Sequence, residues 1–172
     1  MNHSYILLIG HSGTGKSSLS MLLKQEGWKV ISAGDTIRTL AKELGYSISR
    51  KELQKFGNQL LIEKGEYYFA DILANQMHGA NQVIFEGIRP VQVICELKKI
   101  IPELFIVFIE SDSETRFFRL YEQEGLTRDE FNALEIHFME KQVEHGREIA
   151  NCVLDNNGHI NDTFEALKNA IK

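Results

Sequence analysis

The chain has 172 residues, 43% hydrophobic and 25% charged, a composition typical of a globular protein that buries a core without disulfides or metals. Its formal net charge of −5 argues against a surface that coats nucleic acid, because binding to phosphate backbones requires clustered Lys and Arg. A first strand within about five residues of the start leaves no room for a signal peptide, and no apolar run approaches the ~20 residues of a membrane span. We therefore expect one cytoplasmic domain over residues 1–172, with small-molecule substrates and no nucleic-acid or membrane partner.

The order of apolar runs and helical patterns along the chain predicts an α/β fold. Short runs typical of buried strands lie at residues 5–9, 30–31, 83–85, 104–109 and 152–154. Helical periodicity separates each run from the next, and strands that alternate with helices indicate a parallel sheet covered on both faces. We therefore expect three αβα layers around a five-stranded parallel sheet.

Four helix starts carry the pattern of a capping box, in which a Ser, Thr or Asp is followed three positions later by Glu. The four pairs are Ser49 with Glu52, Ser111 with Glu114, Thr127 with Glu130, and Asp162 with Glu165. Each pair predicts a helix that begins directly after its first residue.

The run Gly10-His11-Ser12-Gly13-Thr14-Gly15-Lys16-Ser17 follows the first strand and fills every fixed position of the pattern GxxxxGK[ST]. Its glycines let backbone N–H groups point inward as an anion-binding nest, and the following helix adds its positive N-terminal end. The Lys16 ammonium is expected to reach the β- and γ-phosphates of a nucleotide, and the Ser17 hydroxyl to bind Mg²⁺. The residues that we expect around the ATP phosphates are Gly10, Ser12, Gly13, Thr14, Gly15, Lys16, Ser17 and Ser18.

Two segments are inserted into the alternation of strands and helices. Residues 34–78 separate the second and third strands, and residues 121–130 form a polar hinge after the fourth. Crevices open at the carboxyl ends of parallel strands, where such insertions can close over a ligand. We expect 34–78 to be a helical acceptor-binding insertion and 116–130 to form a short lid.

The cysteines and histidines do not have the spacing of a metal site. Cys95 and Cys152 lie in apolar stretches without CxxC or Cys/His spacing, so we expect buried thiols rather than a zinc site or a disulfide. His137 and His145 lie on one polar helix, where a solvated face is favoured over a pair of metal ligands. The metal that the motifs predict is the Mg²⁺ that accompanies ATP.

The run Ser32-Ala33-Gly34-Asp35-Thr36-Ile37-Arg38 resembles the [ST]xGDx[LI]R segment of P-loop nucleoside monophosphate kinases such as adenylate and cytidylate kinases. In these kinases the arginine binds the phosphate of the acceptor. The resemblance implies that role for Arg38, with Gly34 and Asp35 at the same site, and it implies a P-loop kinase fold.

The run Glu86-Gly87-Ile88-Arg89-Pro90 is similar to the DGFPR segment of the same kinases, with Glu86 in place of the aspartate and the arginine one position early. A carboxylate at a strand end near Lys16 is suited to hold Mg²⁺ through water, and an arginine to pair with a phosphate in a bidentate manner. We therefore expect Glu86, Gly87 and Arg89 to bind the acceptor.

The stretch from Thr115 to the turn Asp155-Asn156-Asn157-Gly158 is more similar to dephospho-coenzyme A kinases. These kinases have an arginine on a helix, a short lid with a Gly-Leu-Ser or Gly-Leu-Thr turn, and a strand that ends in Asp-Asn-x-Gly. The resemblance implies that Arg119 lies against the adenine or phosphates of ATP and that Asn157 and Gly158 border the adenine.

The lid departs from the pattern of those kinases. Gln123 stands where they place an arginine before the acidic-Gly-Leu turn, and Leu134 and Glu135 stand near a second expected arginine. Arg128 and Arg147 are the candidates to replace them. Because positioned cations are the main catalysts of phosphoryl transfer, the missing arginines predict slow or atypical catalysis.

Together these features predict an ATP-dependent phosphotransferase. Arg38 and Arg89 follow different strands and supply a second phosphate site, which favours a phosphate-bearing acceptor over a simple alcohol. A nucleoside or deoxynucleoside monophosphate is the expected acceptor. The residues expected to carry catalysis are Lys16, Arg38, Arg89 and Arg119.

Two alternatives are kept beside this interpretation. The first is dephospho-coenzyme A kinase, which the lid and the Asp-Asn-Asn-Gly turn favour. The second, of another class, is a nucleotide-binding switch or slow ATPase without a small-molecule acceptor. The chain has no Asn-Lys-x-Asp segment typical of guanine-reading GTPases, so ATP is the expected nucleotide in all three.

Overall fold

The computed structural model has the predicted five-stranded parallel sheet, and its strands lie in the order β2-β3-β1-β4-β5. The model describes residues 3–136 and 138–172, with the backbone alone at 138–141. The strands are β1 (Tyr5–Ile9), β2 (Lys29–Ser32), β3 (Val83–Glu86), β4 (Phe105–Glu110) and β5 (Cys152–Asp155). The helices are α1 (Lys16–Gln25), α2 (Ala33–Glu43), α3 (Arg50–Asn75), α4 (Val91–Ile100), α5 (Ser113–Glu124), α6 (Arg128–Glu135), α7 (Phe138–Glu148) and α8 (Ile160–Ala170).

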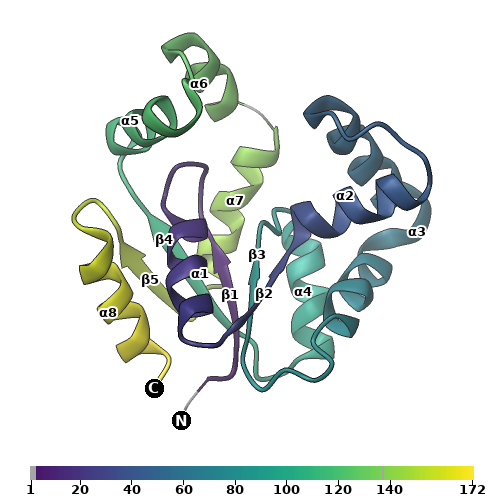
Figure 1. The fold of residues 1–172 in the computed structure, drawn as a ribbon, viewed down its shortest axis with the longest axis horizontal. Coiled ribbons are helices and arrows are strands. Elements are labelled where there is room, and N and C mark those ends of the chain that lie inside the picture. The colour runs from purple at the N-terminus through teal and green to yellow at the C-terminus, as the bar shows by residue number, and fades with distance from the viewer. Residues whose placement is uncertain (1–2, 137) are drawn as a thin grey trace.

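The sheet is covered by helices on both faces because the inner strands are apolar on both sides. On β1, Ile6 and Leu8 belong to a core cluster with residues of α1 and α8, whereas Leu7 and Ile9 belong to a second cluster with residues of α3, α4 and α7. Figure 1 shows these three layers, with α1 and α8 in front of the strands. The result is the α/β P-loop kinase-like fold that the sequence predicts.

The strand register brings Ser32 and Glu86, and likewise Glu110 and Asp155, side by side at the carboxyl ends of the strands. On its other side Glu86 is paired with Leu8 of β1. The first connection runs from β1 past β3 to β2, and β4 and β5 extend the sheet on the other side of β1. Ligands in such sheets bind at the carboxyl ends of the strands beside this reversal, which here is the end of β1.

Two helical segments project beside the carboxyl edge of the sheet, the α2–α3 arm and the α5–α6 arm. The α2–α3 arm begins one residue before the predicted insertion at 34–78 and ends within it, and the α5–α6 arm contains the predicted lid at 116–130. Helix α3 bends at Gly65, which has a φ of 82°, a conformation that glycine adopts without steric cost. Figure 1 shows the two arms projecting on opposite sides of the carboxyl edge, away from both chain termini.

Two of the four predicted helix starts are correct. The Ser49 side chain accepts a hydrogen bond from the Glu52 N–H, and Thr127 and Glu130 form a reciprocal capping box. Helix α5 instead starts one residue after the predicted position, with Asp112 as the cap. The reason is that the Ser111 hydroxyl donates to the Asn156 carbonyl at 2.8 Å and is engaged in the tertiary structure.

The start predicted at Asp162 is also wrong. Helix α8 begins at Ile160, and its cap is His159, whose Nδ1 accepts from the Asn161 N–H. Asp162 therefore lies in the first turn of the helix, where a carboxylate interacts favourably with the helix dipole.

The prediction of two buried thiols is wrong for Cys95, which is exposed because it falls on the outer side of α4. Cys152 is half-buried in β5, and burial raises the pKa of its thiol. His137 lies outside the described residues. Within residues 3–136 and 138–172, no helix is both long and apolar enough to cross a membrane.

Thr127→Ala is expected to raise the pKa of Glu130 part of the way to its ordinary value. Two hydrogen bonds to the Glu130 carboxylate lower that pKa, the larger effect coming from the Thr127 backbone N–H and the smaller from the Thr127 hydroxyl. The substitution removes only the hydroxyl. Because the folded-state pKa is depressed, the capping contribution to stability is present above the unfolded-state pKa and is lost as the pH falls through the folded value.

NMR titration of the Glu130 carboxyl carbon in both proteins measures this shift. Asp112, whose pKa is lowered mainly by the Thr115 N–H at the start of another helix, is the internal control and should not change. Superimposable Glu130 curves would contradict the capping role of Thr127.

Candidate functional site

The phosphate loop between β1 and α1 is enclosed by three other parts of the chain, each against one of its glycines. A Cβ on Gly10 would lie 2.2 Å from the Ile109 carbonyl oxygen of β4. On Gly13 it would lie 2.8 Å from the Arg116 carbonyl oxygen of α5, and on Gly15 it would lie 2.4 Å from the Asn156 amide nitrogen. All three glycines also have positive φ, so both the conformation and the packing of the loop require glycine there.

The Lys16 ammonium lies over its own loop. It donates to the His11 carbonyl at 2.5 Å and to the Thr14 hydroxyl at 3.2 Å, and that hydroxyl donates to the same carbonyl. Ser17 and Ser18 follow in the first turn of α1 and are exposed. The N-terminus of α1 and the lysine thus present positive charge at the mouth of the loop.

Asn156 connects the phosphate loop to the end of β5 through side-chain hydrogen bonds. Its side chain is 1% exposed, donates to the Thr14 carbonyl at 2.8 Å and accepts from the Thr163 hydroxyl at 2.8 Å. The sequence places Asn156 next to Asn157, and only the tertiary structure distinguishes the buried asparagine from the exposed one. The sequence therefore does not predict the contact between Asn156 and the phosphate loop.

A cavity of about 480 Å³ opens directly in front of the loop. Its wall includes most of the residues that the sequence assigns to ATP and the metal, namely Ser12, Gly13, Gly15, Lys16, Ser17, Ser18, Glu86 and Arg119. Glu86 is held in the wall by the Ser20 hydroxyl, which donates to its Oε2 at 2.7 Å. The strand end, the loop and the first turns of α1 thus converge on one space.

The predicted adenine-side residues have structural partners. Arg119 donates to the Ser111 hydroxyl at 3.1 Å and to the Asn156 carbonyl at 2.7 Å, and its side chain lines the 480 Å³ cavity. The Asn157 side chain accepts from the Asp112 N–H at 2.8 Å. Gly158 has open space around it. Asn157 and Gly158 follow Asn156 in the turn after β5 and do not line this cavity.

A second cavity of about 750 Å³ lies between the α2–α3 arm and the carboxyl ends of β2 and β3. Gly34, Gly87 and Arg89 belong to the walls of both cavities, so the two spaces are adjacent. Arg38 lines the second cavity and pairs with Asp35 one turn earlier on α2, and both side chains are more than half exposed. Of the sequence-predicted acceptor residues, Gly34, Arg38, Gly87 and Arg89 thus line this cavity, whereas Glu86 lines only the first cavity and Asp35 lines neither.

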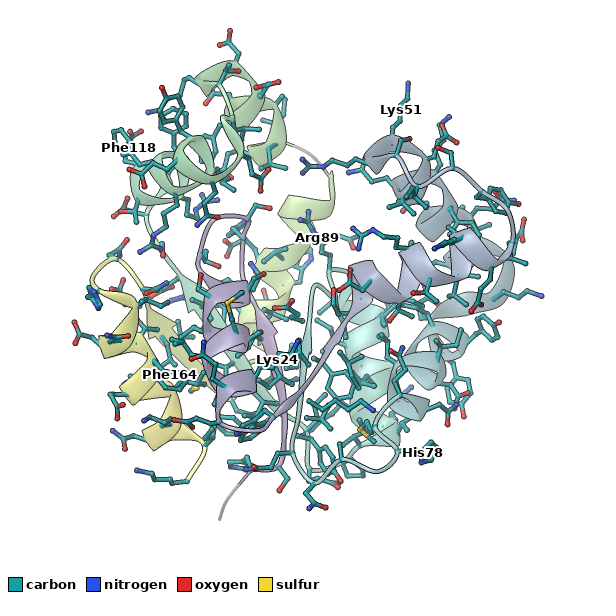
Figure 2. All side chains as sticks on the ribbon, viewed as in Figure 1. Lys24, Lys51, His78, Arg89, Phe118 and Phe164 are labelled. Carbon is teal, nitrogen blue, oxygen red and sulfur yellow. The ribbon has the colours of Figure 1, made fainter. Side chains whose placement is uncertain are left out.

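Arg89 lies where the two cavities meet, because it lines both of them. Its guanidinium donates to the Ser12 hydroxyl of the phosphate loop at 3.2 Å, although it comes from the connection between β3 and α4. Figure 2 shows Arg89 in the space between the α5–α6 arm and the α2–α3 arm. A cation at this position faces both the loop and the second cavity.

The α5–α6 arm is held together by two bidentate ion pairs. Arg116, which is 6% exposed, donates to both carboxylate oxygens of Glu135 at 2.7 and 2.6 Å. Arg128 donates to Glu114 at 2.9 and 2.7 Å and stacks over the Phe117 ring at 3.5 Å. Each partner stabilises the charge of the other, so the pKa of Glu114 is lowered and that of Arg128 is raised.

Ion pairs also engage Arg128 and Arg147, the two candidates to replace the missing lid arginines. Arg128 is engaged by Glu114, and Arg147 of α7 pairs with Glu110 at the end of β4. Neither lines the 480 Å³ cavity, whereas Gln123 does. Glu135, noted as a departure from the lid pattern, is the partner of a buried arginine and so has a structural reason to be acidic.

Comparison with known families identifies the domain type. A family model described as an AAA domain matches residues 6–160, from the first strand to the start of α8. This range contains the phosphate loop, both arms and both cavities. The match supports a P-loop, nucleotide-binding domain.

Curated relatives carry the name UPF0200. One from Saccharolobus islandicus is 31% identical over 124 residues, 69% of this chain and 63% of that protein. Another from Pyrococcus abyssi is 29% identical over 121 residues, 67% of this chain and 65% of that protein. The chain thus spans less than two thirds of the length of these relatives.

Solved structures share the fold. Protein TT1252 from Thermus thermophilus superposes with a TM-score of 0.62 and 20% identity over 98% of this chain and 97% of that one. A gluconokinase from Sinorhizobium meliloti superposes with a TM-score of 0.57 and 14% identity over 98% and 91%. At these identities the likeness shows the kinase-like fold alone.

Asn156→Ala is expected to destabilise the protein by about 1–3 kcal/mol, because it leaves the Thr14 carbonyl of the loop without its buried partner. Urea unfolding followed by circular dichroism measures the loss. Asn169→Ala, at an exposed position of α8, is the control and should change the free energy of unfolding by less than about 0.5 kcal/mol. Equal stabilities of the two variants would contradict the fastening role of Asn156.

Proposed function

Because the chain belongs to the AAA domain family, whose model spans its phosphate loop, we propose that it is a phosphotransferase that moves the γ-phosphoryl group of ATP to a phosphate-bearing acceptor. The observation that carries this proposal is the pair of adjacent cavities that share Arg89, one in front of the loop and one beside Arg38. A switch or simple ATPase needs the first cavity only, whereas transfer needs both. A nucleoside or deoxynucleoside monophosphate is the proposed acceptor.

The residues of the first cavity fit a nucleotide with Mg²⁺. The loop supplies N–H groups and the Lys16 ammonium for the β- and γ-phosphates, and its glycines leave no side chain in the way. Ser17 and, through water, Glu86 would hold Mg²⁺, which when bound neutralises charge on the phosphate oxygens. Glu86 is already oriented towards α1 by Ser20.

In the proposed transfer, an oxygen of the acceptor phosphate forms a bond to the γ-phosphorus. The bond from that phosphorus to the bridging β-phosphate oxygen breaks, and ADP leaves with the electron pair. Arg38 holds the acceptor phosphate, Lys16 holds the donor phosphates, and Arg89 lies between them, where charge builds up during transfer. Arg119 is proposed to border the nucleotide, because it lines the same cavity.

Catalysis is expected to be slow for this class of enzyme. The lid presents Gln123 to the first cavity where related kinases have an arginine, and Arg128 and Arg147 are held by carboxylates elsewhere. The moving phosphoryl group would therefore be stabilised by fewer cations than in those kinases. This shortage does not alter which groups hold the substrates.

The function is tested by incubating the protein with ATP and Mg²⁺ and, in turn, each ribo- and deoxyribonucleoside monophosphate and dephospho-coenzyme A. The expected result is ADP formation that depends on one monophosphate, with the matching diphosphate as the second product. Turnover with dephospho-coenzyme A alone would support the alternative kinase. ATP hydrolysis that no acceptor accelerates would contradict the transferase proposal.

Arg38→Gln is expected to raise the KM for the acceptor by about 10- to 150-fold with little effect on the KM for ATP, because a charge-assisted hydrogen bond contributes about 1.5–3 kcal/mol. Lys42→Gln removes one positive charge one turn further along α2 and is the matched control, since Lys42 is exposed and lines neither cavity. Initial rates at varied acceptor and ATP concentrations separate the two constants. Equal effects on both KM values would contradict the assignment of Arg38 to the acceptor.

A further inference from the structure

The wall of the 750 Å³ cavity concentrates positive charge. Of the 19 Lys and Arg residues in a chain with a net charge of −5, five line this one cavity. They are Arg38 on α2, Arg50, Lys51 and Lys55 on α3, and Arg89 after β3. Three different parts of the chain thus contribute cations to the wall of one cavity.

The cavity wall has no matching negative charge. Across the part of the chain that the structure describes, no Asp or Glu lines it. Three nearby carboxylates lie outside the wall: Asp35 pairs with Arg38, Glu52 pairs with Lys55 at 3.0 Å, and Glu124 of α5 lies 3.9 Å from Arg50. All three are ion pairs between exposed side chains, which contribute little to stability, so an anionic ligand competes with them at low cost.

One phosphate does not account for five cations. Arg38 and Arg89 are placed by the proposed function at the reacting phosphate, next to the phosphate loop. Arg50, Lys51 and Lys55 come from the first two turns of α3, and Figure 2 shows Lys51 at the tip of the α2–α3 arm, apart from Arg89. Positions 51 and 55 are one turn apart and therefore share one side of the helix.

From this separation, and resting on the proposed function, we propose that the acceptor carries a second phosphate group, bound by Arg50, Lys51 and Lys55. Within the proposed class of acceptors, the preferred one is therefore a nucleoside phosphate that carries a second phosphate group, such as a nucleoside bisphosphate. The reacting phosphate binds between Arg38 and Arg89, and the second binds towards the tip of the α2–α3 arm.

The remainder of the wall suits the body of such a molecule. Ile37, Leu61 and Phe69 supply apolar surface, and Gln54 and Asn58 supply donors and acceptors from the α3 side. This combination of apolar surface with a few polar groups is typical of small-molecule sites. A ligand that carries two phosphates on a less polar body matches this mixture of cations, apolar side chains and amides in the wall.

The second phosphate position also adjoins the other arm. Arg50 lies 3.9 Å from the carboxylate of Glu124, which lines the first cavity at the end of α5. Figure 2 shows Lys51 at the tip of the α2–α3 arm, with its side chain extending outward, so Lys51 contributes at the rim of the cavity. Arg50 therefore reaches towards the lid, while Lys51 marks the outer limit of the site.

The test compares the four ribonucleoside 5′-monophosphates with the matching 3′,5′-bisphosphates by isothermal titration calorimetry. Each titration is run with the whole chain, with and without a saturating non-hydrolysable ATP analogue and Mg²⁺, so that binding at the phosphate loop is recognised. We expect one bisphosphate to bind at least ~10-fold more tightly than its monophosphate, because it gains charge-assisted contacts.

The variant that removes the second site carries Arg50→Gln, Lys51→Gln and Lys55→Gln together. It should abolish the difference between bisphosphate and monophosphate, so the Kd of the bisphosphate rises by a larger factor than the Kd of the monophosphate. The matched control carries Lys24→Gln, Lys42→Gln and Lys64→Gln, which remove the same charge from exposed positions outside both cavities. All six positions are exposed, and thermal melts verify that both variants fold.

A second measurement needs no variant. Raising the salt concentration from about 0.05 to 0.5 M should reduce the preference of the unaltered protein for the bisphosphate, because exposed charge pairs are screened. No preference for the bisphosphate, or a preference that survives in the triple variant or persists unchanged in high salt, would overturn the second phosphate site.

The calorimetric test of the second phosphate site gives a result that is distinguishable from the result of the phosphoryl-transfer assay. A bisphosphate preference that depends on the three α3 cations, without any phosphoryl transfer to an acceptor, would support the site and count against the transferase. Turnover of a monophosphate with no bisphosphate preference would do the reverse. The calorimetry therefore decides the second phosphate site independently of catalysis.

Discussion

The packing of the phosphate loop is the constraint on which the rest of the structure depends. Its three glycines lie too close to a β4 carbonyl, an α5 carbonyl and the Asn156 side chain to be replaced by any larger residue. The loop is therefore positioned by elements distant in sequence, rather than by its own conformation alone. Because α5 is one of these elements, the arm that carries the lid is attached directly to the loop that would hold ATP.

The same edge of the sheet explains why two cavities adjoin. Parallel strands bring Ser32 and Glu86 into register, so the segments that follow β2 and β3 leave the sheet side by side. The first of these segments starts the α2–α3 arm, and the second carries Arg89 to the phosphate loop. A phosphate site opposite the loop is thus a consequence of strand order, and in our proposal it is the basis of transfer between two bound substrates.

The arms differ in how their charges are used. In the α5–α6 arm the arginines are paired: Arg116 is buried against Glu135, and Arg128 is stacked and paired with Glu114. The pair of Arg116 with Glu135 connects α5 to α6, and both pairs leave little positive charge for a ligand. In the α2–α3 arm Arg38, Arg50 and Lys55 also have carboxylate partners, but these carboxylates are exposed and lie outside the wall of the 750 Å³ cavity, so a bound anion can compete for the cations. Ligand recognition by charge is therefore concentrated in one arm.

The sequence by itself determined the αβα fold, the phosphate loop and the strand ends that carry Arg38 and Arg89, because these depend on local periodicity and on glycine at fixed spacing. It did not determine which of two adjacent asparagines is buried, or that Ser111 is engaged by the turn after β5 and so does not cap α5. Only the tertiary structure decided these points, and with them the concentration of cations in one cavity. The physical reason is that burial, hydrogen-bond partners and the sum of charges around a cavity depend on residues that are distant in sequence.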